Sequence, residues 1–279
     1  MCGEKVRYFM RENGSDHLYR FIAEYFNREC AFYEILEDWP EIKKATAYAI
    51  EKWEYGKVGA CGAVIMRDLS SEAEPSDIYN GLNNSQLLEI ISQIAWIQVY
   101  GLAGKPIPEI RVSDGYMQIF YQMEEPASTW TTLHPGMTEM FEKMRHLYKS
   151  REFWDYVLRI AHRKLEIPDV ICHGDMWTYN FLWSRGEQNG QGKELSALLD
   201  WQNVHHGNPA EDICHLFVFC CDTEMRRKVE KEMLPILHQM VEERCIQMRI
   251  PVPYTLEQLE AAYRIQLVAQ TTHFVFIGI

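Results

Sequence analysis

The feature that most constrains the fold is a short apolar run that ends in a His-Gly-Asp turn. Residues 170–172 (Val-Ile-Cys) resemble the end of a β-strand, and the chain continues as His173-Gly174-Asp175, with Asn180 five residues after the acid. A carboxylate can accept a hydroxyl proton, and an amide oxygen beside it can hold a metal ion. This spacing is therefore typical of a phosphoryl-transfer loop.

A second acid supports the same reading. Asp200 follows the apolar run 195–199, so two acids and an amide all stand at the ends of predicted strands. Asp and Asn after a strand are commonly turn-formers, and for any one of these residues alone that explanation is equally good. Together, with a glycine between His173 and Asp175, they favour a site for a divalent metal and phosphate.

Composition excludes some classes of function. The chain has 279 residues, enough for one large domain or two small ones, and its formal charge of −12 argues against a nucleic-acid-binding surface. No apolar run approaches the roughly 20 residues of a membrane helix, and the N-terminus lacks a signal pattern. The eight cysteines form no CxxC pair, so we expect reduced thiols in a cytoplasmic protein and no structural zinc site. The oligomeric state is left open.

Hydrophobic periodicity predicts the order of elements. A helix over 16–38 precedes two strands, 45–51 and 60–68, joined by a turn at 55–57, and the polar segment 70–76 is the best linker candidate. After it the chain is mostly helical, with a helix capped at Asn84-Ser85 and two helices within 137–165 that break near Ser150. Further predictions are strands at 168–172, 181–183 and 195–199, a turn at 205–209, and helices over 210–221, 223–247 and from Thr255. The stretch 104–135 has no clear pattern, and the apolar end 274–279 is more typical of an interior segment than of a terminus.

These residues point to a family. The pattern His173-x-Asp175-x-x-x-x-Asn180, followed by Asp200-Trp-Gln and by Gly-Asn-Pro-x-Glu-Asp at 207–212, resembles the choline-kinase-like (CHK) domain of ecdysteroid-kinase-like proteins, most closely their uncharacterised nematode branch. The resemblance extends from about Asn27 to the segment 255–259, which is most of the chain. It implies an α+β, protein-kinase-like two-lobe fold of the aminoglycoside phosphotransferase and choline kinase type. The implied division is a truncated small lobe over 1–69 and a mainly helical catalytic lobe over 70–279.

The resemblance also implies a role for each residue of the turn. Asp175 would be the catalytic base for the acceptor hydroxyl, His173 would brace the loop, and Asn180 and Asp200 would hold the magnesium ions that bridge the phosphates of ATP. Asp212 would accept hydrogen bonds from the loop backbone, although an acid at a helix N-terminus, favoured by the helix dipole, is an equally good reading. Trp177, Trp183 and Trp201 are expected to pack rather than to stack on substrate.

The residues that would bind the nucleotide match the family pattern less completely than the His-Gly-Asp turn does. The segment Met66, Arg67, Asp68 and Leu69 would be the inter-lobe hinge that meets adenine, although the family tends to have Glu where Arg67 stands. Glu29 would be the helix acid that pairs with a strand lysine, whereas its periodicity alone favours a solvated glutamate. Neither a Gly-rich loop nor a Val-Ala-x-Lys strand precedes the helix, and Lys5 is the one nearby candidate.

Three hypotheses follow for the function. The first is an ATP-dependent kinase acting on a small hydroxylated molecule such as a steroid alcohol or a choline-like amine. The second is a catalytically impaired kinase-like binding or regulatory protein, or a truncated isoform, because poor positioning of ATP would remove several kcal/mol of transition-state stabilisation. The third, a metal-dependent phosphoesterase, is weaker because no His-rich ligand set accompanies the acids.

Overall fold

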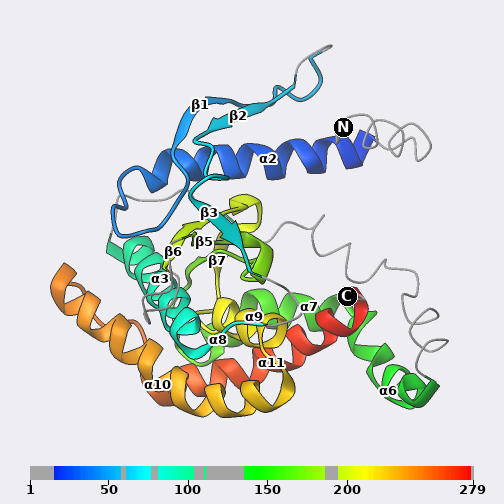
Figure 1. Cartoon of the computed structure of the whole chain (residues 1–279). Helices are drawn as coiled ribbons and strands as arrows, with labels where there is room; N and C mark the ends of the chain where they lie inside the picture. Colours follow the sequence, from blue (N-terminus) through cyan, green and yellow to red (C-terminus); the bar gives the residue numbers. More distant parts are fainter. Residues whose placement is uncertain are drawn as a thin grey trace.

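The computed structural model describes residues 16–57, 61–76, 81–103, 110, 135–185 and 194–277. In Figure 1 a long helix and a two-stranded hairpin lie above a body of short strands and helices. The upper part comprises α2 (Asp16–Leu36), β1 (Ala47–Glu51) and β2 (Ala63–Met66), with the two strands antiparallel. Predicted segments within 104–109, 111–134, 186–193 and the first 15 residues lie outside the described residues.

The lower part holds two small sheets and most of the helices (Figure 1). One sheet has the order β3-β5-β6, formed by β3 (Ala73–Pro75), β5 (Phe181–Ser184) and β6 (Leu195–Leu198). The other pairs β4 (Val170–Cys172) with β7 (His205–Gly207), also antiparallel. Around them are α3 (Asn84–Ala103), α6 (Thr138–Tyr148), α7 (Arg151–Asp155), a π-helical turn η2 (Tyr156–Ile160), α8 (Ala161–Lys164), α9 (Glu211–Cys220), α10 (Thr223–Met248) and α11 (Leu256–Ile277), with short 3-10 turns η1 (Pro135–Met137), η3 (Thr178–Asn180) and η4 (Trp201–Asn203).

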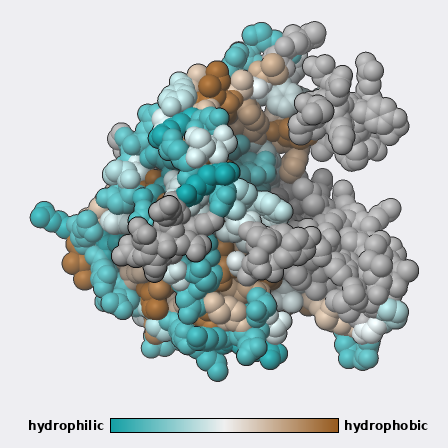
Figure 2. Space-filling view, viewed as in Figure 1, coloured by the Kyte–Doolittle hydropathy of each residue, from teal (hydrophilic) through white to brown (hydrophobic). Residues whose placement is uncertain are grey.

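The core is centred on α3, which is apolar on nearly all sides and therefore buried on nearly all sides. Gly101 near its end lies so close to β4 that a Cβ there would stand 2.5 Å from Ile171 Cγ1. The helix consequently fixes the strand that leads into the His-Gly-Asp turn. On the face seen in Figure 2 hydrophobic residues are scattered among hydrophilic ones. Among the described residues, no helix is both long and apolar enough to cross a bilayer.

Several predicted boundaries are confirmed by their capping bonds. Ser150 caps α7 by accepting a hydrogen bond from the backbone N–H of Phe153, at the break predicted in the sequence. Thr255 and Gln258 form a reciprocal capping box that opens α11. The cap of α3 is Asn83, one residue before the predicted Asn84, because its side chain accepts from the Gln86 N–H at 3.0 Å.

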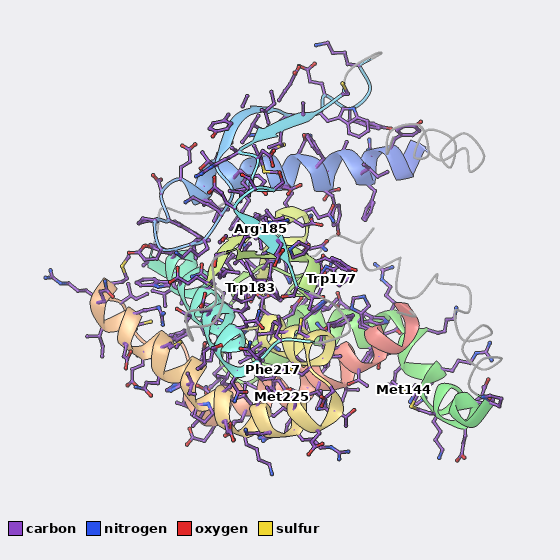
Figure 3. All side chains as sticks on the ribbon, viewed as in Figure 1. Met144, Trp177, Trp183, Arg185, Phe217 and Met225 are labelled. Carbon is purple, nitrogen blue, oxygen red and sulfur yellow. The ribbon has the colours of Figure 1, made fainter. Side chains whose placement is uncertain are left out.

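Two predictions were wrong. The polar segment 70–76 is no free linker, since it contains β3, whose Ala73 is buried and pairs with Ser184 of β5. Arg185, labelled in Figure 3, also donates from Nε to the Ala73 carbonyl at 3.1 Å. The predicted turn at 205–209 begins as β7, because pairing with β4 outweighs the turn propensity of Gly207. The division of the chain at residues 69 and 70 stays a prediction.

Candidate active site

The His-Gly-Asp turn is held by backbone geometry that requires its glycine. Gly174 has φ +81°, and a Cβ there would lie 2.6 Å from the Asn203 carbonyl oxygen. A side chain at this position would therefore be strained twice, by the dihedral angle and by the contact. The turn closes through η3, in which the Asn180 N–H donates to the Trp177 carbonyl at 2.9 Å.

Asp212 anchors the backbone of the His-Gly-Asp turn. Its two carboxylate oxygens accept the backbone N–H groups of His173 at 2.8 Å and Gly174 at 2.9 Å. Burial raises the pKa of Asp212 to about 6, and the two hydrogen bonds act in the opposite direction. Asp212 also stands in the first turn of α9, so the two readings of this acid are compatible.

His173 is neutral, and both of its ring nitrogens form hydrogen bonds. Its Nδ1 accepts the Asp175 N–H at 3.3 Å, which leaves Nε2 to donate to the Leu199 carbonyl at 3.0 Å. Burial lowers the pKa of His173 to about 4. With both nitrogens engaged and the ring against Trp201, the side chain supports the turn and has no lone pair free for a metal.

Asp175 and Asn180 form the centre of the site. The Asn180 Nδ2 donates to the Asp175 carbonyl at 2.9 Å and to its carboxylate Oδ2 at 3.0 Å. With Nδ2 engaged in this way, Oδ1 is the atom of the Asn180 amide that could act as a metal ligand. Burial, and then the charge of Asp200, raise the pKa of Asp175 to about 7.

Asp200 is brought to the same place by the β5–β6 pairing. The Leu199 N–H donates to the Asn180 carbonyl at 2.9 Å, so Asn180, just before β5, and Asp200, after β6, lie at the same end of the strand pair. Asp200 has φ 63°, in the left-handed region that few non-glycine residues adopt. Its Oδ2 accepts from Gln202 at 3.2 Å, and burial raises its pKa.

Glu29 joins this cluster from α2. Its Oε1 accepts the Trp201 N–H at 3.3 Å, which places the carboxylate next to Asp200 rather than in solvent. The periodicity reading of Glu29 as a solvated residue was therefore wrong, because a single helix acid directed inward does not change the apolar stripe. Burial, and then Asp200, raise the pKa of Glu29 to about 7.

The three acids lack a cationic partner in the part of the chain that the structure describes. Asp175, Asp200 and Glu29 form no ion pair with a described Lys or Arg. Lys44, a partly buried lysine that follows α2, donates instead to the carbonyls of Leu36 and Trp39. Three crowded carboxyls with raised pKa values, beside an amide oxygen, are the donors that Mg²⁺ prefers, so the residues fit a divalent cation.

The predicted hinge makes local contacts outside the acid cluster. The Arg67 N–H donates to Thr46, and its guanidinium bonds both oxygens of Glu72 at 2.6 and 2.8 Å. Asp68 accepts from the Ser70 N–H, while the Leu69 carbonyl accepts from two later N–H groups. Met66 ends β2 and is 38% exposed. The adenine-binding role of this hinge stays a prediction.

The three tryptophans near the site differ in how deeply they are buried. Trp183 and Trp201 are 1% and 0% exposed and pack in the core, as predicted; Trp201 stacks on Phe32 of α2 at 5.0 Å. Figure 3 shows Trp183 inside the body of the molecule. Trp177 is partly buried and meets Tyr179 edge-on at 4.9 Å.

The structure adds one residue that sequence reasoning missed. His215 of α9 places Nε2 3.7 Å from the Asp175 Oδ1, whereas Asn180 bonds the other carboxylate oxygen. Burial, and then the nearby His273, lower the pKa of His215 well below its usual range, so the ring is neutral. His215 lies three residues after Asp212, and residues at this spacing share one face of a helix. This spacing is the sequence signal that places His215 near the turn.

Comparison with solved structures identifies the fold. A mutant of aminoglycoside 2'-phosphotransferase-IIIa, solved as its GDP complex, superposes with a TM-score of 0.50 at 13% identity, covering 93% of this chain and 76% of that one. Together with the mixed helix and sheet, this defines the class: the fold is the protein-kinase-like α+β fold.

The family is defined by sequence. Residues 2–276 match the DUF1679 family, described as "Uncharacterized oxidoreductase dhs-27", and the chain belongs to it. The relative of that name from Caenorhabditis elegans is 31% identical over 96% of this chain and 33% of its own length. The viomycin phosphotransferase of Streptomyces vinaceus is 31% identical over 32% of this chain and 30% of its own. The chain thus spans about a third of the length of these curated relatives.

Proposed function

We propose that the chain transfers the terminal phosphoryl group of a nucleoside triphosphate to a hydroxyl of a small molecule. The observation that carries this proposal is the convergence of Asp175, Asn180 and Asp200, which the β5–β6 pairing and the Asp212 anchor put within one site. Asn180 and Asp200 would hold Mg²⁺, which supplies positive charge to the phosphate oxygens. The CHK subfamily and a steroid-like or choline-like acceptor belong to this proposal too.

The residues of this chain would divide the remaining work. Asp175, oriented by Asn180 on one carboxylate oxygen, would accept the proton of the acceptor hydroxyl. A base with a pKa near 7 is well matched to this task at neutral pH. His173 and Asp212 would keep the turn fixed while the proton moves.

The name of the relative from Caenorhabditis elegans raises an oxidoreductase as a competing function. This chain contains no Gly-x-Gly-x-x-Gly run, which is the usual fingerprint of a dinucleotide-binding strand-turn-helix. The match also spans a third of that relative, so its name can describe another part of it. The residues of this chain support phosphoryl transfer better.

A thermal-shift titration tests the proposal. Mg-ATP and Mg-GTP, each at millimolar concentration, should raise the melting temperature of the full chain, because a ligand that binds only the folded state stabilises it. Asp200→Asn should abolish the shift, whereas Asp222→Asn, a charge-matched change at the N-cap of α10, should leave it intact. No shift with either nucleotide in the wild type would contradict the proposal.

The second candidate is a kinase-like binding protein that holds a nucleotide without transferring phosphate. The observation that favours it is Glu29, which meets Trp201 and Asp200 instead of a lysine among the described residues. Retained Mg-nucleotide binding with no phosphate transfer to a panel of steroid alcohols and amino alcohols would support this candidate.

We also infer a reducing, cytoplasmic location. The seven described cysteines are all unpaired, and five of them are buried. Fractionation of cells that express the full chain would test this inference, and recovery from an oxidising compartment would contradict it.

A further inference from the structure

Three buried side chains of different chemistry converge beneath the catalytic turn. Cys172 ends β4, His205 begins β7 and Glu211 begins α9, and the first two lie directly opposite each other in the antiparallel pair. The thiol, the imidazole and the carboxylate place their donor atoms within 4.8 Å of one another, and none of the three residues is more than 4% exposed. We propose that Cys172, His205 and Glu211 bind a zinc-like divalent transition metal, at a site separate from Asp175, Asn180 and Asp200.

The histidine is oriented as a ligand. Its Nδ1 lies 2.8 Å from the Asn203 carbonyl oxygen, and since a carbonyl can only accept, Nδ1 carries a proton. Metal-binding histidines are commonly fixed in this way by a backbone carbonyl. Its Nε2 faces the Glu211 Oε2 at 3.2 Å, close to the separation of two ligand atoms that each stand about 2 Å from one tetrahedral metal.

Charge balance favours a divalent cation. A Cys172 thiolate and a Glu211 carboxylate carry two negative charges, and a neutral His205 carries none, so a dication makes the buried site neutral. Without metal, His205 pairs with Glu211 through Nε2, and the Cys172 thiol donates to the Asn208 carbonyl at 3.3 Å. Metal binding would release the Nε2 proton of the imidazolium and the thiol proton to solvent. The Asn208 carbonyl oxygen, 3.3 Å from the Cys172 Sγ, is a candidate for the fourth donor.

The surrounding backbone leaves space for this arrangement. A Cβ at Gly207 would lie 2.8 Å from the His205 Nε2 and 3.3 Å from the Glu211 Oε2, so any side chain there would intrude on the donors. A thiolate and an imidazole select zinc-like metals, whereas the all-oxygen set around Asp200 suits Mg²⁺. The ligands come from three elements, 33 and 6 residues apart, which is why no sequence spacing revealed them.

Cobalt provides the direct test. The full chain, freed of metal by chelation and dialysis, should bind one equivalent of Co²⁺ with a thiolate-to-cobalt charge-transfer band and the strong visible bands of a four-coordinate ion. Cys172→Ser should lose the charge-transfer band and weaken Co²⁺ binding by more than the roughly 10- to 100-fold typical of supporting residues. Cys245→Ser, which removes a buried thiol of α10, and Asp200→Asn should both keep the band.

The opposite results would overturn the site. Absence of the charge-transfer band in the wild type, or its persistence in Cys172→Ser, would leave only a buried imidazolium–carboxylate pair beside a thiol. If Cys172→Ser does not fold, His205→Gln takes its place, and native mass spectrometry of Asp200→Asn with Zn²⁺ decides: one retained zinc supports the proposal, and none refutes it. These readouts use no nucleotide, so they are independent of phosphoryl transfer.

Discussion

The two sides of the candidate active site are built in different ways. The catalytic-loop block (β4, β5, β6, β7 and α9, with the turns between them) is buried and is tied by side chains that bond backbone groups far away in sequence. The small-lobe block (α2, β1 and β2) presents a hairpin with large apolar side chains in solvent, Tyr48 at 66% and Ile65 at 60% exposure. The blocks meet where Glu29 and Phe32 of α2 contact Trp201.

The preorganised groups of the candidate site lie in the catalytic-loop block. The groups proposed to act on the acceptor hydroxyl are fixed before any ligand binds, because Asp212, His173 and Asn180 hold them. On the nucleotide side the described residues offer Glu29 but no cation beside it. A site of this kind can be ready for the chemistry and still depend on bound metal to complete its electrostatics.

The largest expected effect is on activity. Asp175→Asn should reduce phosphate transfer by roughly 10²- to 10⁴-fold, because the amide keeps a bond to Asn180 but cannot accept a proton. Steady-state kinetics with Mg-ATP and an accepted alcohol would measure it, with Asp222→Asn as the control. Unchanged turnover would show that Asp175 is not the base. It would also contradict the idea that the catalytic-loop block holds the reacting groups.

Removal of the anchor should produce the largest loss of stability. Asp212→Ala leaves two buried N–H groups without acceptors, at about 1–3 kcal/mol each in the free energy of unfolding. Asp222→Ala, which removes the exposed cap of α10, should cost about 1 kcal/mol. Urea denaturation of both variants would measure the difference; equal losses would mean that the turn does not depend on Asp212.

A matched pair of isoleucines compares the blocks directly. Ile171→Ala in β4 should lower the free energy of unfolding by about 2–5 kcal/mol, because Ile171 is fully buried against α3. Ile65→Ala in β2 should change it by no more than about 0.5 kcal/mol. A similar loss from the second variant in chemical denaturation would show that the hairpin is covered in solution.

The smallest expected effect is a pH dependence. Burial and Asp200 raise the pKa of Glu29 from 4.5 to about 7, so the folded state binds more protons than the unfolded state between these values. Stability should therefore fall as pH rises from about 5 to about 8, less steeply in Glu29→Gln, and Mg²⁺ should restore part of it at the upper end. Unfolding curves across this range would test it, and parallel slopes for the two proteins would contradict it.

Much of the catalytic-loop block could be predicted from sequence because its signals are local. The strand, the glycine turn and the spacing from Asp175 to Asn180 are all contained in one short stretch, 170–180, and Asp200 follows its own strand. The Asp212 hydrogen bonds implied by the family resemblance are present at 2.8 and 2.9 Å. The catalytic and metal-binding roles of these residues stay predictions.

What sequence could not supply depends on contacts between distant segments. The polar composition of residues 70–76 predicts a linker, whereas the strand character of β3 comes from its pairing with β5, far along the chain. Periodicity alone places Glu29 in solvent, because one inward acid does not change the apolar stripe, whereas the family resemblance places it at the nucleotide site. The hydrogen bond from the Trp201 N–H, 172 residues away, shows that Glu29 points inward. His215 and the Cys172–His205–Glu211 cluster were missed for the same reason.

The left-handed backbone of Asp200 restricts which changes this position can tolerate. At φ 63° the residues that fit with little strain are Gly, Asn and Asp. Glu would keep the negative charge but would strain the backbone. Ala would also strain the backbone, and it has no side-chain atom that could bind a metal. A relative that abandoned metal binding here would reach its new state most easily through Asn or Gly. The identity of this one residue in other chains of the family is thus an inexpensive indicator of which members keep the proposed metal site.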